Sequence, residues 1–217
     1  MVTVDDGVEF VREGVQIGAD LGQRVDPTAI IVAEKQRRAD GELHYVIRHV
    51  ERLPLNTSYP AIVERLAEIY KKLSRRRPFP DVLVDATGVG SPVVDLLTKA
   101  GIDVTAVYLT GGEKATYEGS ELRLPKQLMV SRLQVLLQQR LIHLPDTPDA
   151  AALVDELLNF EIKVTDAANL QFGAFKVGSH DDLAVALGLA CWEGPDLTIR
   201  FGDPDDELTR LLNDYRG

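Results

Sequence analysis

The sequence predicts an α/β fold in which a mixed, five-stranded sheet is flanked by helices and accompanied by an additional β-hairpin. Three features of the chain support this prediction. Apolar and polar residues alternate in the N-terminal segments, as they do in half-buried antiparallel strands. Farther along, segments with helical spacing alternate with short apolar runs, which is typical of parallel strands joined by helices. Near residue 160, a second alternating segment is followed by a polar turn and a return, which predicts the hairpin.

Three antiparallel strands are expected at the start of the chain. The alternation over residues 15–20 predicts the first strand, and the apolar run 28–33 predicts the second. The turn Ala-Asp-Gly at 39–41 leads into a third strand over 43–50. These strands would form the antiparallel part of the sheet.

The next segments are expected to alternate between helix and strand. Ser58 can cap a helix that has Pro60 in its first turn. Its apolar residues recur at helical spacing: Ile62, Leu66, Ile69 and Leu73. A strand over 82–84, a helix over 92–100 and a strand over 104–109 follow.

The C-terminal half is expected to contain a loop, three helices and the hairpin. The segment 110–123 is polar, contains glycine and has no period, which suggests a mobile loop. Helices are expected from Pro125 and over 148–160, and the hairpin is expected over 160–172. The last helix, 181–192, is apolar almost all round and should be buried on several sides. This order of elements matches a ribonuclease H-like sheet, in which the first strand is central and the fourth lies beside it.

Length and composition are those of one main domain. The chain has 217 residues, 45% hydrophobic and 27% charged, so it can bury one substantial core. We expect the domain to span residues 1–195 and an acidic C-terminal tail to span 196–217. Cys191 lies in an apolar run and is expected to be a small core residue. The first residues have the wrong charge for a signal peptide, and no apolar run reaches the roughly 20 residues that cross a bilayer. We therefore expect a cytoplasmic protein that does not bind membranes.

The net charge of −10 argues against an ordinary nucleic-acid binder, whose affinity comes largely from Lys and Arg that neutralise phosphates. Part of the excess lies in the tail, where six acidic residues oppose three arginines. The middle of the chain has basic runs near Arg37, Arg75 and Lys126, although such runs are more often solvated faces than DNA contacts. A site built from carboxylates would also add negative charge that bound metal ions cancel.

Two acidic residues end strands that we expect to be neighbours. Asp20 ends the first strand, on the face of Gln16 and Gly18, whose polar or small side chains leave a space. Asp85 ends the fourth strand before a glycine-rich turn into a helix, the place where ligands collect in open α/β sheets. Two alternatives remain open: Asp20 forms a turn with Gly22, and Asp85 caps a helix.

A second acidic site begins the last helix. Asp181 and Asp182 stand next to an apolar helix, where their charge is costly to bury without a cation. The alternative is a capping box formed by Ser179, His180 and these acids, since acidic residues near a helix N-terminus complement its dipole.

Taken together, the acidic residues predict a metal site. Carboxylates without a Cys or His cluster favour a hard cation, Mg²⁺ or Mn²⁺. Two such ions about 4 Å apart can activate a water and stabilise the leaving 3′ oxygen of a phosphodiester. We therefore predict that Asp20, Asp85, Asp181 and Asp182 are the catalytic residues and ligands of two ions. The carboxyl oxygens of Asp20, Asp85 and at least one of Asp181 and Asp182 should lie within about 8 Å of a common point. His180 either orients a water or leaving group or makes an ordinary polar contact.

The segments around Asp20, around Asp85 and around Asp181 and Asp182 resemble the nuclease pattern of the large terminase subunit, which belongs to the ribonuclease H-like superfamily. The resemblance extends over residues 15–192, and its most specific part is the His-Asp-Asp start of an apolar helix. The matching segments are Ala19-Asp20-Leu21-Gly22 with Asp26-Pro27-Thr28-Ala29, Val84-Asp85-Ala86-Thr87-Gly88-Val89-Gly90, and His180-Asp181-Asp182-Leu183-Ala184.

The resemblance implies a metal-dependent endonuclease that makes double-strand cuts in DNA during packaging of a viral, typically bacteriophage, genome in the host cytoplasm. It also implies that the hairpin 160–177 and the loop 110–123 position the DNA. The implied partners are double-stranded DNA, a portal protein, a small terminase subunit and an ATPase motor domain. The chain lacks the Gly-x-x-x-x-Gly-Lys-[Ser/Thr] motif of such a motor, so it is expected to be an excised nuclease domain or a self-standing relative.

Three other functions are compatible with parts of this pattern. Holliday-junction resolvases share the fold and the arrangement of acidic residues. A non-catalytic docking module could retain the scaffold, although acids at all three places argue against lost catalysis. Actin-like or sugar-kinase ATPases have similar Asp-Leu-Gly and Asp-Ala-Thr-Gly segments, but that fold needs two such domains and a longer chain.

Overall fold

The computed structural model describes residues 2–5, 8–22, 26–75, 79–88, 91–159, 161–164, 170–173 and 181–193. The strands of the main sheet are β1 (Val2–Asp5), β2 (Val8–Asp20), β3 (Ala29–Arg38), β4 (Leu43–Arg52), β5 (Asp81–Asp85), β6 (Thr105–Thr110), β7 (Thr116–Glu118), β8 (Glu121–Pro125) and β9 (Ile142–His143). A separate hairpin consists of β10 (Glu161–Val164) and β11 (Leu170–Gly173). The helices are α1 (Tyr59–Leu73), α2 (Ser91–Lys99), α3 (Lys126–Gln138), α4 (Pro148–Asn159) and α5 (Asp182–Ala190).

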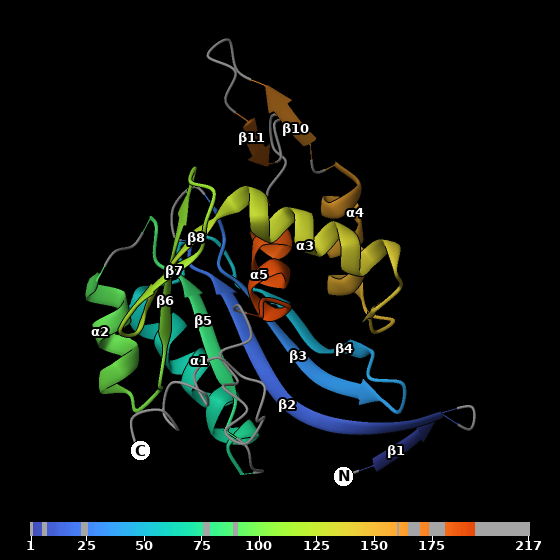
Figure 1. Cartoon of the computed structure of the whole chain (residues 1–217). Coiled ribbons are helices and arrows are strands. Elements are labelled where there is room, and N and C mark those ends of the chain that lie inside the picture. Colours follow the sequence, from blue (N-terminus) through green and yellow to red (C-terminus); the bar gives the residue numbers. More distant parts are fainter. Residues whose placement is uncertain are drawn as a thin grey trace, which may run out of the picture.

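Within these residues, nine strands form one mixed sheet in the order β7-β8-β6-β5-β2-β3-β4-β9, with β1 paired to β2 (Figure 1). Strands β2, β3 and β4 are antiparallel, whereas β5 and β6 run parallel to β2. The predicted α/β fold is confirmed, and β2 is central with β5 beside it. Strands β1, β7, β8 and β9 widen the sheet beyond the five predicted strands. The sequence did not predict them, because two to five residues are too few to give a clear periodic pattern.

The segment 110–123 differs from the loop that the sequence predicted. It contains β7 and the start of β8, and β8 runs parallel to β6. Leu122 and Leu124 are fully buried and alternate with Glu121 and Arg123, which is the period of a strand. Pro125 ends this strand. The alternation of Glu121 to Leu124 is too short to be recognised as a strand in the sequence, directly before a predicted helix start.

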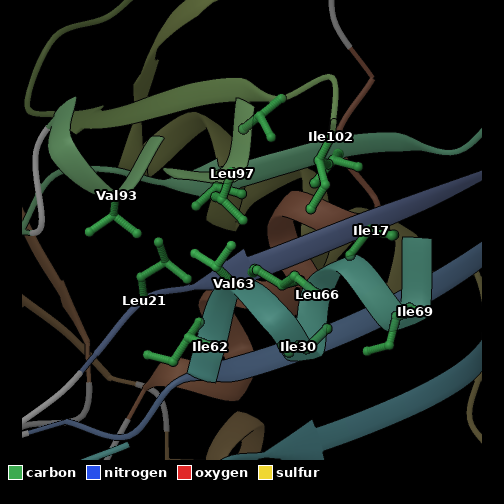
Figure 2. Packing of buried hydrophobic residues seen from close by; sticks show 14 of the residues in the cluster. Ile17, Leu21, Ile30, Ile62, Val63, Leu66, Ile69, Val93, Leu97 and Ile102 are labelled. Atoms are coloured by element: carbon green, nitrogen blue, oxygen red, sulfur yellow. The ribbon is translucent and has the colours of Figure 1, made fainter. Parts of the chain in front are cut away.

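Each face of the sheet is covered by helices. Val15, Ile17 and Ala19 of β2 pack with apolar side chains of α1 and α2 in one core cluster (Figure 2). The residues between them therefore lie on the opposite face, where α3, α4 and α5 pack in two further clusters. Helix α1 begins as predicted, since Ser58 Oγ accepts a hydrogen bond from the backbone N–H of Ala61 at 3.4 Å.

Helix α5 lies between the sheet and the outer helices α3 and α4 (Figure 1). All nine of its residues are buried, which confirms the expectation from its apolar composition. Cys191, which follows the helix, is also buried, as predicted for a small core residue. Strands β10 and β11 form the predicted antiparallel hairpin. Of the expected acidic tail, residues 196–217, none lies among the described residues.

None of the helices in the described part of the chain is both long and apolar enough to cross a bilayer.

Candidate metal centre

Asp20 and Asp85 are adjacent at the ends of two neighbouring parallel strands. They are register partners in the pairing of β2 with β5. Asp20 lies on the same face as Gly18, and Asp85 lies on the same face as Leu83, which packs with residues of α5. Both carboxylates therefore lie on the face of the sheet that α5 covers. This confirms that the two strand ends place these residues side by side.

The N-terminus of α5 brings Asp181 and Asp182 into electrostatic contact with Asp20. Burial raises the pKa of Asp20 well above its usual value, and the charges of Asp85, Asp181 and Asp182 raise it further. The ammonium of Lys126 acts in the opposite direction and lowers this pKa. The predicted acids thus form one interacting group, with Asp20 coupled to each of the other three.

Asp85 also stabilises the turn that follows its strand. Its Oδ1 accepts a hydrogen bond from the backbone N–H of Thr87 at 2.8 Å. Burial raises the pKa of Asp85, hydrogen bonds from Thr87 and the charge of Lys126 lower it, and the charge of Asp181 raises it. Turn formation and a place in the acidic group are therefore compatible roles for this residue.

Asp181 and Asp182 have different environments although they are adjacent. Lys126, the first residue of α3, places its Nζ 2.9 Å from Oδ2 of Asp181, whose side chain is 32% exposed. Arg52, at the end of β4, donates from Nε to Oδ2 of Asp182 at 2.8 Å, and Asp182 is only 2% exposed. One acid thus faces the partly open side of the group, while the other is anchored inside the protein.

Of the capping alternative, the described residues test only the part played by Asp181 and Asp182. Asp181, not Ser179, is the N-cap residue of α5, and its side chain makes no capping hydrogen bond. Its carboxylate contacts Lys126 instead. His180 and Ser179 lie outside the described residues.

As the side chains stand in the described part of the chain, no three Asp, Glu, His or Cys residues are grouped closely enough to hold a metal ion. The chemistry of the acidic group nevertheless fits a hard divalent cation, because the four predicted ligands are carboxylates. Their mutual repulsion, which raises the pKa of Asp20, would be relieved by a bound cation. The common point within about 8 Å of these carboxylates stays a prediction.

Helix α5 approaches β2 so closely that Gly18 cannot carry a side chain. A Cβ at Gly18 would lie 2.2 Å from the carbonyl oxygen of Ala186 and 2.3 Å from the backbone nitrogen of Ala190. The expectation that Gly18 leaves a space for the site is therefore wrong, because the helix backbone fills it. The small residue instead allows α5 to lie directly on the central strand.

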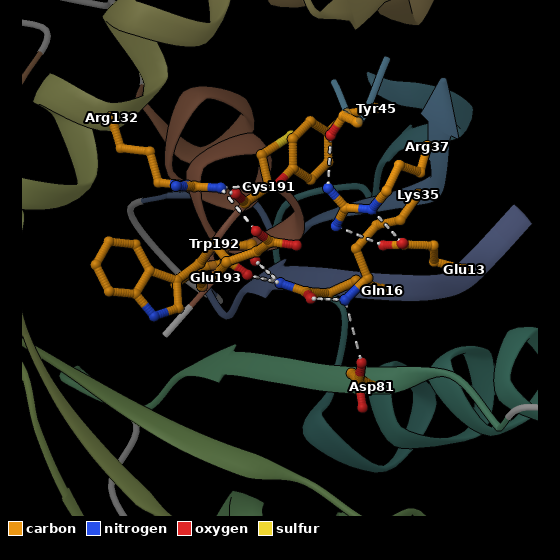
Figure 3. Close-up of polar contacts among 12 residues, drawn as sticks. Glu13, Gln16, Lys35, Arg37, Tyr45, Asp81, Arg132, Cys191, Trp192 and Glu193 are labelled. Carbon is orange, nitrogen blue, oxygen red and sulfur yellow. Dashed lines mark hydrogen bonds and ion pairs between the residues drawn. The ribbon is translucent and has the colours of Figure 1, made fainter. Parts of the chain in front are cut away.

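Side chains from β2 and α3 hold the C-terminal end of α5 (Figure 3). Gln16 donates from Nε2 to the carbonyl oxygens of Leu189 at 2.7 Å and Trp192 at 2.6 Å. Arg132 donates from Nε to the carbonyl oxygen of Cys191 at 3.0 Å. These donors satisfy carbonyl groups that a helix end leaves without intrahelical partners. Gln16 thus orients the helix and leaves no room for a ligand at this position.

Sequence reasoning missed Arg52 and Glu156, which contact the N-terminal end of α5. Arg52 forms an ion pair with Glu156 as well as with Asp182. Glu156 had a detectable signal, because it follows Ala150 and Leu153 at a spacing of three on the buried face of α4. A glutamate at such a position calls for a partner. Lys126 was considered only as part of a basic run, either a solvated face or a DNA contact, and nothing local predicted its contact with Asp181.

Comparison with known proteins identifies the family. The sequence model of the family described as Terminase RNaseH-like domain matches residues 17–193. No curated protein sequence matches the chain. The structure is similar to that of the large terminase nuclease from thermophilic phage G20c, with a TM-score of 0.61 and 24% identity over 89% of this chain and 92% of that chain.

Two further structures show the same fold. The magnesium-bound form of the G20c nuclease gives a TM-score of 0.60 and 23% identity over 87% of this chain and 88% of that chain. The human cytomegalovirus terminase nuclease domain gives a TM-score of 0.52 and 13% identity over 87% of this chain and 86% of that chain. Because the family match runs from the central strand to the end of α5, the chain belongs to the terminase RNaseH-like domain family.

Proposed function

We propose that this chain is an endonuclease that cleaves double-stranded DNA during viral genome packaging, with two Mg²⁺ or Mn²⁺ ions held by Asp20, Asp85, Asp181 and Asp182. The observation that carries the proposal is the in-register pairing of Asp20 with Asp85 next to the N-terminus of α5. The similar nuclease from phage G20c was solved with bound magnesium, which supports a divalent cation as the cofactor.

The carboxylates differ in what they contribute. Asp20 interacts electrostatically with each of the other three acids, so it would help to hold the ions that they bind. Asp85 is held by its turn, and Asp181 lies on the more exposed side of the group. When bound, such ions supply an activated water and neutralise charge at the leaving 3′ oxygen.

Lys126 is the cation that this chain itself places in the acidic group. Its ammonium contacts Asp181 and partly balances the charge of Asp20 and Asp85. In the complex with DNA, this ammonium would also be able to contact a phosphate oxygen of the backbone. The proposal also includes the partners of a packaging terminase: a portal protein, a small terminase subunit and an ATPase motor.

A plasmid cleavage assay tests the proposed function. Supercoiled plasmid should be nicked or linearised in millimolar Mn²⁺ or Mg²⁺, with little sequence preference, and should remain intact in EDTA. A four-way DNA junction serves as the competing substrate. Strong preference for the junction would indicate a resolvase-like activity, and intact DNA in every metal would contradict the proposed nuclease function.

Metal binding should also be measurable without DNA. A divalent ion that binds only the folded state, and whose free concentration is about ten times its Kd, adds about 1.4 kcal/mol to the free energy of unfolding. At this chain length, the wild-type melting temperature should rise by about 3 to 6 °C between EDTA and millimolar Mn²⁺ in scanning fluorimetry. Asp85→Asn should lose most of this increment, yet melt no lower than wild type in EDTA, because it removes one of the repelling charges. A wild-type melting temperature unchanged by Mn²⁺ would contradict the two-ion site.

A further inference from the structure

The start of α5 is capped by a residue from another helix. An N-cap aspartate ordinarily accepts a hydrogen bond from the second or third backbone N–H of its helix. Asp181 makes no such bond. The third amide, that of Ala184, instead donates to Oε2 of Glu156 on α4 at 3.1 Å.

Arg52 links this cap to the acidic group. Its guanidinium pairs with Oε1 of Glu156 through one nitrogen and with Oδ2 of Asp182 through Nε. Glu156 is 9% exposed and Asp182 is 2% exposed, so these contacts lie inside the protein and fix the helix start against β4 and α4. Charge-assisted bonds of this kind are stronger and more directional than neutral ones.

We propose that Glu156 is a positioning residue of the metal site: it caps α5 in place of Asp181, so that the carboxylate of Asp181 keeps its contact with Lys126 beside the ends of β2 and β5. Without the cap from Glu156, the carboxylate of Asp181 would be drawn back to the unsatisfied amide of its own helix. The inference rests on the proposed function, because it concerns how the same acids are held ready for cations.

Two substitutions of similar size separate capping from packing. Glu156→Gln retains a carbonyl oxygen that can accept the Ala184 N–H, whereas Glu156→Met fills the same volume without an acceptor. Both remove the charge that faces Arg52, so the difference between them isolates the cap. The matched control is Glu51→Gln, which weakens the ion pair between Glu51 on β4 and Arg65 on α1, a pair that does not involve α5.

The measurement is the Mn²⁺ concentration at the midpoint of the melting-temperature rise, followed without DNA, and the concentration for half-maximal plasmid nicking. We expect Glu156→Met to raise both concentrations by about tenfold or more, because mutation of residues that orient metal ligands typically lowers metal affinity by this amount. Glu156→Gln should lie much closer to wild type. The control should lower the melting temperature equally with and without metal and leave the Mn²⁺ midpoint unchanged.

Equal Mn²⁺ midpoints for wild type, Glu156→Gln and Glu156→Met would overturn the inference while leaving the nuclease proposal intact. A wild type that neither binds Mn²⁺ nor cuts DNA would instead overturn the proposed function. Should Glu156→Met not fold, Glu156→Asp makes the same comparison, since it retains the charge but is one methylene shorter. A wild-type midpoint in Glu156→Asp would then overturn the inference.

Discussion

Asp20→Asn and Asp85→Asn should each lower the rate of DNA cleavage by about 100- to 1000-fold. Ions at such a site stabilise the charge of the transition state by several kcal/mol, and each 1.36 kcal/mol corresponds to about a factor of ten in rate. An asparagine retains the shape of the side chain but not the charge that attracts a cation. The measurement is the initial rate of plasmid nicking at saturating Mn²⁺ for each variant and wild type.

The matched control for this experiment is Asp81→Asn. Asp81 lies at the other end of β5, with a side chain that is 65% exposed and 3.5 Å from Lys35. Exposed pairs of this kind contribute little to stability, so Asp81→Asn should cut DNA at the wild-type rate. If both Asp20→Asn and Asp85→Asn retained cleavage, the active site would lie elsewhere.

Gly18→Ala should lower the free energy of unfolding by about 3 kcal/mol, the upper part of the range for overpacked cores. The added Cβ would meet backbone atoms of α5 at 2.2 and 2.3 Å, and backbone atoms cannot move aside by changing a rotamer. For a chain of this length, the melting temperature should fall by about 6 to 12 °C. Thermal melts in EDTA measure this effect independently of metal binding.

Gly14→Ala is the control for Gly18→Ala, because Gly14 is a buried glycine of the same strand that has room for a Cβ. The nearest atom to an added Cβ is Cε of Lys35 at 3.7 Å, an ordinary contact. Its stability should stay within about 0.5 kcal/mol of wild type. A Gly18→Ala protein as stable as Gly14→Ala would show that α5 does not pack on β2 as described. Displacement of α5 should also move Asp181 away from Asp20 and reduce cleavage of the fraction that remains folded.

Local patterns in the sequence were sufficient to predict the central strands and the position of Asp20 and Asp85 at their ends. The alternation around Ile17 and the apolar run before Asp85 indicate which residues face a core. Neighbouring parallel strands end at the same edge of a sheet, which places Asp20 beside Asp85. The same reasoning failed for residues 110–123, since an alternation of four residues gives no clear period. It also took Gly18 and Gln16 as lining a space, because periodicity shows which face is small or polar but not what packs there.

The sequence by itself therefore determined the order of the central strands and the helices, the family, and the acidic residues at the strand ends and helix start. Only the tertiary structure decided how the helix start is held over those strand ends. Lys126 lies 55 residues from Asp181 along the chain, Arg52 lies 130 residues from Asp182, and Glu156 lies 28 residues from Ala184. Contacts over such separations leave no local period or spacing in the sequence, because they form only when packing of α5 on Gly18 brings separate elements together.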